Sequence, residues 1–447
     1  MHLNHGTGPL RAPEESAADE PDLTGDAQLD AEIVPALGSR PAPVPARAIL
    51  LTGATGFLGA YLLRDLLAHG PATVVCLVRA GSTKEARLRV EANLQRYGLG
   101  LTPEQEGRME CVPGDMAEPL LGLPPATYES LADRIEAVFH GAATVNFYQT
   151  YRQLRGANVG GAREMLRFAV RTRVKALHYV STTGVFDSDA ARGVVVRETD
   201  APAHCRGSVM GYTQTKWVAE QLMLGARARG LPVSIYRPPF IMGDSRSGVV
   251  DEENLIVKML IGSIQGGAWP AEPMEVEMVP VDALSRAIVY LAAGPVGTGR
   301  TFHLASPRPM RWADIGHAAR AFGYPLELRT YAEWKHRLAE FARRKTNALR
   351  PLLRLFTKVP RHLGAPVPEV FTRPPRPVFD STATQAELAP AGLVPPRMDH
   401  AMFATYLRFF MRQGWLPAPA EMQAAPAATL RSRAGSRPPM AAASRHA

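Results

Sequence analysis

The sequence predicts an α/β protein with a doubly wound parallel sheet, followed by a smaller and mostly helical lobe. From residue 48 to about residue 241, short apolar runs typical of buried strands alternate with segments of helical periodicity. Beyond residue 241 this alternation is lost, and most later segments have helical periodicity alone. A glycine-rich turn directly after the first apolar run supports the same fold.

The first strand and helix enclose that glycine-rich turn. In AILLTGATGFLGA, residues 48–60, an apolar run leads into Gly53, Gly56 and Gly59. Glycine removes the Cβ atoms that would block a pyrophosphate, and the free amides at a helix start attract an anion. With a second buried strand at residues 73–78, the turn predicts a Rossmann-type βαβ unit that binds a dinucleotide. A turn that binds nothing is the alternative.

A basic residue follows the second strand, where an NAD enzyme places an acid on the ribose. Arg79 occupies that position, and Arg89 follows ten residues later. Because a guanidinium pairs with a 2′-phosphate rather than with a 2′-hydroxyl, we expect NADPH as the cofactor, with Arg89 as the second half of the clamp. Either arginine could instead be a surface charge.

Four further strands are expected at residues 109–112, 136–140, 177–180 and 233–236, and helices at residues 82–97, 158–172 and 211–228. Asp115 follows the first of these strands, the small residues of GAATVN follow the second, and Ser181, Thr182 and Thr183 follow the third. The carboxyl ends of parallel strands meet at one edge of a sheet, so we expect ligand contacts there. Asp115 could instead cap a helix.

Tyr212 and Lys216 lie four residues apart in the helix expected over residues 211–228, so they share one face. A nearby ammonium lowers the pKa of a phenol, which then donates a proton more readily to a carbonyl that accepts hydride. Thr182, at the end of the preceding strand, is placed to hydrogen-bond the same oxyanion. Without Thr182, the Tyr-x-x-x-Lys pattern would indicate only two ordinary surface residues.

Composition limits the class of protein. A chain of 447 residues with 46% hydrophobic residues can form one large domain and a smaller one. The net charge of +9 indicates solubility and weak association, not nucleic-acid binding. The three cysteines have no pairing or metal spacing, and no signal peptide or membrane span is evident. We therefore expect a cytoplasmic monomer without a metal or a membrane span.

The two ends of the chain are rich in Ala and Pro and have no sustained periodicity. We expect a disordered linker over residues 1–45 and a disordered tail over residues 417–447. The dinucleotide-binding domain is expected over residues 46–250 and a substrate-binding helical lobe over residues 251–416, with some segments rejoining the first domain. Late helices are expected at residues 254–264, 282–293, 312–321 and 402–415, and a late strand at residues 302–305.

Several motifs occur in the order and at the intervals of the extended short-chain dehydrogenase/reductases. They are TGATGFLG, the arginine of CLVRA, Gly114-Asp115, HGAATVN, NVGGAREML, YVSTTGV and YTQTK. Within that superfamily, residues 48–416 resemble the thioester reductases, which are the terminal reductase domains of nonribosomal peptide synthases, polyketide synthases and carboxylic acid reductases. The male-sterility and fatty acyl-CoA reductases are close relatives.

The resemblance implies a catalytic trio of Thr182, Tyr212 and Lys216. It also implies that NADPH is lined by the glycine turn, the two arginines and residues after the later strands: Gly53, Thr55, Gly56, Phe57, Leu58, Gly59, Arg79, Arg89, Asp115, Met116, Ala142, Ala143, Asn158, Lys216, Pro238 and Ile241. One departure concerns the path beside the nicotinamide amide, because Pro239 stands where the family usually has glycine.

The resemblance further implies NADPH-dependent reduction of an acyl thioester, bound to a carrier-protein phosphopantetheine or to coenzyme A. The product is an aldehyde, with further reduction to the alcohol as an option. Two alternatives are an extended short-chain reductase or epimerase that acts on a sterol or a nucleotide sugar, and an NADPH-sensing regulator without catalysis. The presence of Thr182, Tyr212 and Lys216 favours catalysis over sensing.

Positive charge is concentrated in residues 335–361, where nine Lys or Arg face the single acid Glu340. We expect this stretch to belong to a docking face for an acidic acyl or peptidyl carrier protein. The alternative is a solvated helix face without a partner.

Overall fold

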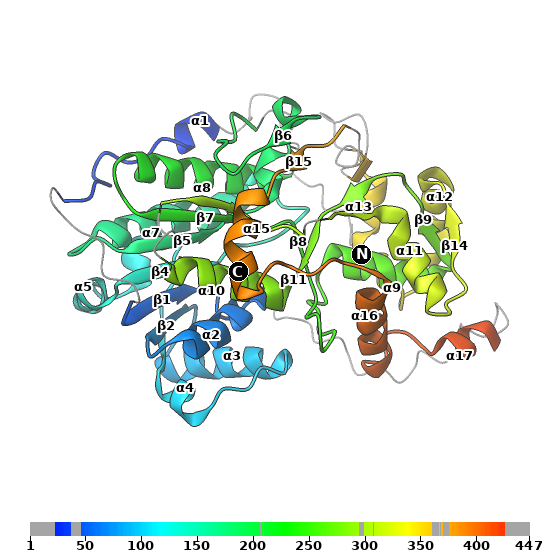
Figure 1. The fold of residues 1–447 in the computed structure, drawn as a ribbon, viewed down its shortest axis with the longest axis horizontal. Helices are drawn as coiled ribbons and strands as arrows, with labels where there is room; N and C mark the ends of the chain where they lie inside the picture. The colour runs from blue at the N-terminus through cyan, green and yellow to red at the C-terminus, as the bar shows by residue number, and fades with distance from the viewer. Residues whose placement is uncertain are drawn as a thin grey trace, which may run out of the picture.

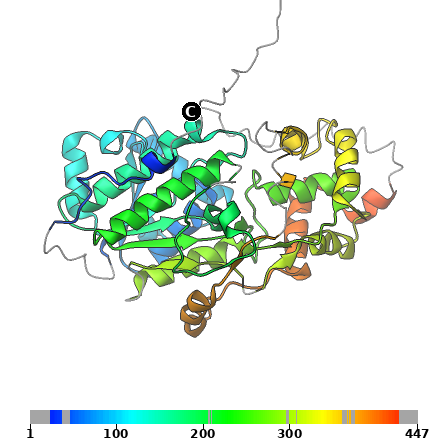
Figure 2. The ribbon, with the colours of Figure 1, turned by 90° about the horizontal axis from the view of Figure 1, so that it is seen from above.

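The computed structural model describes residues 23–36, 46–205, 208, 210–294, 299–306, 308–359, 366, 368–369 and 375–424. Figures 1 and 2 show two lobes side by side, one that holds a large sheet and a smaller one built mainly of helices. Within the described ranges, no helix is both long and apolar enough to cross a membrane.

The larger lobe is organised around a seven-stranded sheet in the order β12-β7-β5-β4-β1-β2-β3, in which all neighbours are parallel. The order reverses between β1 and β4, so the carboxyl ends of these two strands form the crevice where doubly wound sheets bind ligands. The predicted sheet is therefore confirmed. Its strands are β1 (Ala48–Thr52), β2 (Thr73–Val78), β3 (Met109–Pro113), β4 (Ala137–His140), β5 (Ala176–Val180), β7 (Val233–Arg237) and β12 (Thr301–His303).

Helices cover both faces of this sheet (Figure 1). On one face, α2 (Phe57–His69), α3 (Thr83–Arg96) and α10 (Val281–Ala293) contribute apolar side chains to one core. On the other face, α5 (Pro125–Arg134) and α8 (Gly211–Ala228) contribute to a second core. The bounds of α8 are those that its periodicity predicts, which fixes Tyr212 and Lys216 in its first two turns.

The helix expected over residues 158–172 begins earlier than predicted. It starts with α6 (Tyr151–Arg155), passes through a π-helical turn (Gly156–Gly160) and continues as α7 (Gly161–Val170). The N–H of Thr150 donates to Oε1 of Gln153 at 2.9 Å, so a Thr-x-x-Gln start signal was present in the sequence. The two glycines at the π-helical turn concealed the continuity of the helix.

The smaller lobe packs around its own apolar core, in which Trp269 and Trp334 are fully buried. Their indole N–H groups donate to the carbonyl of Trp312 at 3.1 Å and to Oγ of Ser263 at 3.2 Å. Buried polar donors that find partners support a single packed arrangement. The helices are α9 (Leu255–Gly266), α11 (Trp312–Ala321), α12 (Tyr331–Phe341), α13 (Leu353–Thr357) and α16 (His400–Arg412).

The division at residue 250 is interrupted by segments that return to the larger lobe. β12 pairs with β7, α10 covers the sheet, and α15 (Thr382–Leu388) adds Leu388 to the same core. In addition, β15 (Val378–Phe379) pairs in parallel with β6 (Val195–Val196). The expectation that some later segments rejoin the first domain describes this arrangement.

The expectation of a disordered linker over residues 1–45 is wrong for residues 23–36. This docked segment begins with α1 (Leu23–Asp26), and its Ile33 is 1% exposed within the core of the larger lobe. Arg229, directly after α8, donates to the carbonyls of Leu29, Asp30 and Ile33. Residues 1–22 and 37–45 lie outside the described residues.

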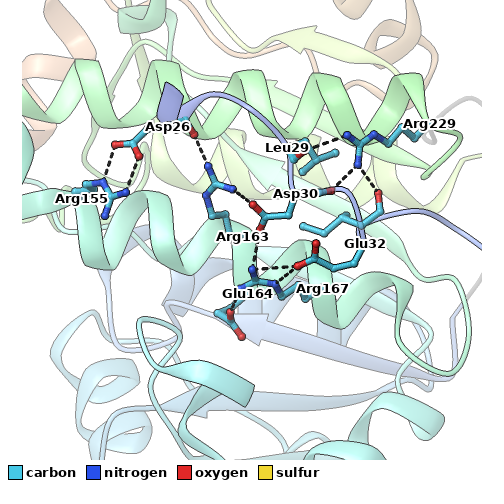
Figure 3. Close-up of polar contacts among 10 residues, drawn as sticks. Asp26, Leu29, Asp30, Glu32, Arg155, Arg163, Glu164, Arg167 and Arg229 are labelled. Atoms are coloured by element: carbon cyan, nitrogen blue, oxygen red, sulfur yellow. Dashed lines mark hydrogen bonds and ion pairs between the residues drawn. The ribbon is translucent and has the colours of Figure 1, made fainter. Parts of the chain in front are cut away.

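Acidic side chains fasten the docked segment to α6 and α7 (Figure 3). Asp26 accepts two bonds from Arg155, at 2.6 and 2.5 Å, and Asp30 accepts bonds from Arg163 and Arg167. The prediction failed because composition describes the segment alone, whereas its acids find partners on helices more than a hundred residues away.

The tail expected over residues 417–447 is likewise docked at its start. The carbonyl of Pro417 accepts the Tyr324 hydroxyl at 2.9 Å, and Gln423 donates to the carbonyl of Gly323 at 2.8 Å. Met422, within α17 (Pro419–Ala424), is 8% exposed and belongs to the core of the smaller lobe. Residues 425–447 lie outside the described part of the chain.

Candidate active site

The glycine turn after β1 lies against the loop after β4. Gly53 has a φ of +87°, and a Cβ added there would lie 2.9 Å from the backbone nitrogen of Ala142. A Cβ at Gly59 would lie 1.9 Å from the carbonyl oxygen of Gly53, so the first turn of α2 packs directly on the glycine turn. The backbone approach that a pyrophosphate site needs is therefore present, and it depends on these two glycines.

Asn93 also shapes this turn, although the motifs of the sequence did not identify it. Its amide nitrogen donates to the carbonyls of Ala54 and Gly56, each at 3.0 Å, and the residue is 8% exposed. The available signal was an amide on the buried face of α3, between Val90 and Leu94. A buried amide at such a position usually bonds a neighbouring backbone.

Thr52 and His140 form a second support at the ends of β1 and β4. Thr52 Oγ1 and His140 Nδ1 share a hydrogen bond of 2.8 Å, and the N–H of Ala142 donates to the same threonine oxygen at 3.2 Å. Burial lowers the pKa of His140 to about 3, so its ring is neutral at physiological pH. The pair holds the loop that begins at Gly141 and includes Ala142 and Ala143.

Arg79 and Arg89 lie together at the carboxyl end of β2. Both residues are exposed, and the guanidinium of Arg89 donates to the backbone carbonyl of Arg79. The structure thus brings the two predicted halves of the phosphate clamp into contact. Their binding of a 2′-phosphate stays a prediction.

Asp115 and Met116 have structural contacts of their own. Asp115 Oδ1 accepts the N–H of Ala117 at 2.9 Å within a turn, and the helix that follows has Glu118 at its N-cap, so the helix-cap alternative is not found. A Cβ added at Gly161 would lie 3.1 Å from Cγ of Met116, so Met116 packs against the start of α7. The contacts of both residues with a cofactor stay predictions.

Asn158 holds the loop after β4 from the π-helical turn. Its Oδ1 accepts the N–H of Thr144 at 2.7 Å, and its Nδ2 donates to the Thr144 carbonyl at 3.1 Å and to Thr215 Oγ1 at 3.0 Å. The residue is 4% exposed, and its amide is used by protein atoms. Asn158 therefore positions the loop, and its predicted cofactor contact stays a prediction.

Thr182 and Tyr212 belong to two turns that pack against each other. Thr182 Oγ1 accepts the N–H of Gly184 at 3.1 Å, and a Cβ added at Gly184 would lie 3.2 Å from the Thr213 side chain. The start of α8 packs closely on the backbone at Gln149, because a Cβ added at Gly211 would lie 2.5 Å from it. The end of β5 and the first turn of α8 are thus held side by side.

Lys216 is buried one turn after Tyr212. Its Nζ donates to the Val180 carbonyl at 2.7 Å and lies 4.1 Å from the centroid of the Tyr179 ring. Burial lowers the pKa of Lys216 to about 7, and the negative charge of Glu220 opposes that shift.

The expected effect of Lys216 on Tyr212 is not found. We predicted a lowered phenol pKa, whereas burial raises the pKa of Tyr212 to about 12. The ammonium of Lys216 is directed to the Val180 carbonyl. At neutral pH, Tyr212 is therefore a protonated phenol that can donate.

Pro239 does not interrupt the path from β7 to β8 (Phe240–Met242). The carbonyl of Pro238 accepts the N–H of Thr183 at 3.0 Å, and the carbonyl of Ile241 accepts the side chain of Asn254 at 2.8 Å. β8 then pairs in parallel with β11 (Met278–Pro280). Pro238 and Ile241 flank this path, and their contacts with a cofactor stay predictions.

The part of the chain that builds this site matches a known family. The family described as Male sterility protein, an NAD-binding family, matches residues 51–288. The chain belongs to this family. A nicotinamide cofactor is consistent with the glycine turn described above, where backbone packs so closely that Gly53 and Gly59 have no room for a Cβ.

This male sterility family member is similar to reductase domains of peptide synthetases. It is 37% identical to one polypeptide of the linear gramicidin synthase of Brevibacillus parabrevis, over 84% of this chain and 7% of that protein. The terminal R domain from the myxalamid PKS-NRPS pathway shares 38% identity, with a TM-score of 0.80 over 89% of this chain and 98% of that one. The chain thus spans a small part of the synthase and nearly all of the solved domain.

A second solved structure agrees. The reductase domain of a nonribosomal peptide synthetase from Mycobacterium tuberculosis shares 25% identity, with a TM-score of 0.68 over 88% of this chain and 99% of that one. The predicted resemblance to terminal reductase domains and the predicted fold are confirmed.

Proposed function

We propose that the chain is an NADPH-dependent oxidoreductase that reduces an acyl thioester to an aldehyde. The observation that carries this proposal is the placement of Thr182, Tyr212 and Lys216 at the end of β5 and the start of α8, in the same sheet edge as the glycine cradle. The similarity to terminal reductase domains supports the reaction class.

Each member of the trio has a proposed role. When bound, the nicotinamide supplies hydride to the thioester carbonyl. Thr182 and Tyr212 donate hydrogen bonds to the oxygen that becomes negative, and the high pKa of Tyr212 keeps its proton available. Tyr212 gives its proton to this oxygen, and the hemithioacetal then collapses: the C=O bond re-forms, the carbon–sulfur bond breaks, and the proton leaves with the thiol, so that an aldehyde remains. Lys216 is close enough to the end of β5 to hold the ribose beside Tyr212.

The 2′-phosphate form of the cofactor is supported by the two exposed arginines at the end of β2. The guanidinium of Arg89 contacts the backbone of Arg79, so the two residues are neighbours at the end of β2. Two cations there favour a dianionic phosphate over a hydroxyl. Binding measurements with both cofactors test this choice.

A carrier protein is the proposed partner that presents the thioester. In the basic stretch, Lys335 pairs with Glu369 at 2.5 Å and Arg337 with Glu327 at 3.0 Å, so part of its charge is neutralised. Arg343, Arg344 and Lys345 are exposed on one turn after α12. We propose that this turn contacts the carrier protein. Arg361, at the end of the basic stretch, lies outside the described residues.

The test is to incubate the protein with NADPH and a panel of acyl carrier proteins and acyl-CoAs, and to identify products by mass spectrometry. Aldehyde or alcohol with oxidation of NADPH supports the proposal. Reversing Arg343, Arg344 and Lys345 to Glu should raise the KM for a carrier-bound substrate and leave that for acyl-CoA unchanged. Consumption of a sterol or a nucleotide sugar instead would move the chain to the alternative class.

A further inference from the structure

A buried ion pair lies behind the catalytic trio. Arg237, at the end of β7, donates from Nε at 3.0 Å and from Nη2 at 2.6 Å to Oε1 of Glu220 on α8. The two side chains are 1% and 0% exposed. Burying two charges costs several kcal/mol per ion, and an apolar pair of similar size is often as stable. Stability alone therefore does not account for this pair.

The second oxygen of Glu220 connects this pair to the catalytic strand. Ser181 Oγ donates to Glu220 Oε2, and Ser181 is 3% exposed. Ser181 directly precedes Thr182 in the sequence. One turn earlier on α8, Lys216 donates to the carbonyl of Val180. Lys216 and Glu220, one helical turn apart on α8, thus bond the consecutive residues Val180 and Ser181 at the end of β5.

Arg237 extends the same network to the segments that flank the site. Its Nη2 donates to the Asp200 carbonyl at 2.9 Å, and its Nη1 lies 3.1 Å from Nε2 of His303. His303 Nδ1 lies 2.7 Å from the carbonyl of Asp380, directly after β15. Each nitrogen of the guanidinium has a partner, and fully satisfied buried networks hold one arrangement.

We propose that Glu220 is a positioning residue for thioester reduction: by holding Ser181, it sets where the Thr182 hydroxyl lies relative to Tyr212 and Lys216. This inference rests on the proposed function. Because a displacement of about 1 Å in a catalytic group can cost on the order of 10² in rate, a single lost bond to Ser181 has a measurable effect. Glu220 touches no reacting atom; it acts through its bond to Ser181, and its charge also favours the protonated form of Lys216.

The chain offers a matched control. Glu136, before β4, is also buried, at 2% exposed, and accepts bonds from Arg47 Nε and Nη2, at 3.1 and 2.8 Å. It lies at the opposite, amino end of the sheet, where its backbone N–H bonds the carbonyl of Ala48. Glu136→Gln therefore removes a buried, arginine-paired carboxylate without reaching the site.

The experiment compares Glu220→Gln, Ser181→Ala, their double variant and Glu136→Gln, with NADPH and octanoyl-CoA as the probe. We expect kcat to fall about 10- to 100-fold in both single site variants, with little further loss in the double variant and the KM for NADPH within about twofold. Glu136→Gln should keep the wild-type kcat. A wild-type kcat in Glu220→Gln, or a loss no larger than in Glu136→Gln, overturns the inference.

Two further arms keep the outcome decisive. The wild type and Tyr212→Phe in the same assay separate the hypotheses. No NADPH-dependent aldehyde from the wild type refutes the proposed function, whereas full activity of Tyr212→Phe only removes Tyr212 from the mechanism. An inactive Tyr212→Phe beside a fully active Glu220→Gln refutes only the positioning role. Amide hydrogen exchange of residues 181–186 needs no turnover. Because the Gly184 N–H bonds Thr182 Oγ1, exchange should be faster in Glu220→Gln than in Glu136→Gln, and equal exchange counts against the inference.

Discussion

The two ends of the parallel sheet each bury a glutamate against an arginine, but the two pairs serve different purposes. At the amino end, Glu136 is buried while the side chain of its partner Arg47 is 84% exposed. At the carboxyl end, both Glu220 and Arg237 are buried, and their remaining polar atoms bond the catalytic strand and its flanking segments. The pair Glu136–Arg47 joins two chain segments, whereas the pair Glu220–Arg237 holds the end of β5 in place beside the site.

The general lesson is that burial of a charge does not by itself indicate function. The carboxyl end differs because its buried groups bond the end of β5. Ser181, which precedes Thr182, bonds Glu220, and Lys216 bonds the carbonyl of Val180. Changes at this end should affect rate or cofactor affinity. Changes at the amino end, and in the docked segment, should affect stability.

The largest effect is expected from Tyr212→Phe. Removing one donor to an oxyanion costs about 10² to 10³ in kcat, because the hydroxyl acts mainly in the transition state. Binding of NADPH, followed by fluorescence titration, should change little. A variant that turns over at the wild-type rate would remove Tyr212 from the mechanism and weaken the contrast between the two ends.

A smaller effect is expected from Arg79→Ala. Loss of one charge-assisted phosphate contact costs about 1.5 to 3 kcal/mol, so the Kd for NADPH should rise by about 10- to 100-fold while that for NADH stays nearly unchanged. Arg87→Ala is the control, because Arg87 lies on α3, the helix that carries Arg89, and pairs with Glu91. Equal affinity of the wild type for both cofactors would contradict the assignment.

The docked segment should contribute to stability and not to rate. We expect Asp26→Asn with Asp30→Asn to lower the free energy of unfolding by about 1 to 2 kcal/mol, since several partly exposed ion pairs are lost. Asp133→Asn, which removes an exposed acid elsewhere, is the control. Thermal melts and steady-state rates check both parts. A fall in kcat at unchanged stability would show that the segment acts on the site.

The same segment should be sensitive to acid. The hydrogen bond from Arg155 lowers the pKa of Asp26 below its ordinary value of 3.8. A carboxyl whose pKa is lower in the folded than in the unfolded chain stabilises the fold above the unfolded value, and this contribution is lost as the pH falls through the folded value. Hydrogen exchange of residues 23–36 at pH 7 and below pH 4 measures it, and unchanged protection would refute the linkage.

The smallest effect is expected from Glu136→Gln. Glutamine keeps the shape and one acceptor, so we expect a loss of about 1 kcal/mol in stability and no change in kcat. Denaturant unfolding and a steady-state assay suffice. A reduced kcat at this position would mean that the two ends of the sheet are coupled.

The local pattern of the sequence was sufficient for the sheet and for the catalytic helix. Strands such as β2 are continuous apolar runs, and α8 begins and ends at the predicted residues, because hydrophobic periodicity and turn residues act over short distances. The motif order likewise indicated the family, and the trio that it implies stays a prediction. Gly53 and Gly59 were identified because a Cβ would block a pyrophosphate, whereas the structure shows that a Cβ at either position would also meet protein backbone.

Only the tertiary structure decided the contacts between distant parts of the chain. The acids of residues 23–36 looked like a disordered linker because their arginine partners lie on α6 and α7. Lys216 was expected to act on Tyr212, but the carbonyl of Val180 receives its ammonium. Glu220 and Arg237 have no spacing that predicts a pair, since α8 and β7 meet only when the sheet forms. Charge pairing and burial depend on which surfaces meet in space, and periodicity along the chain does not encode that.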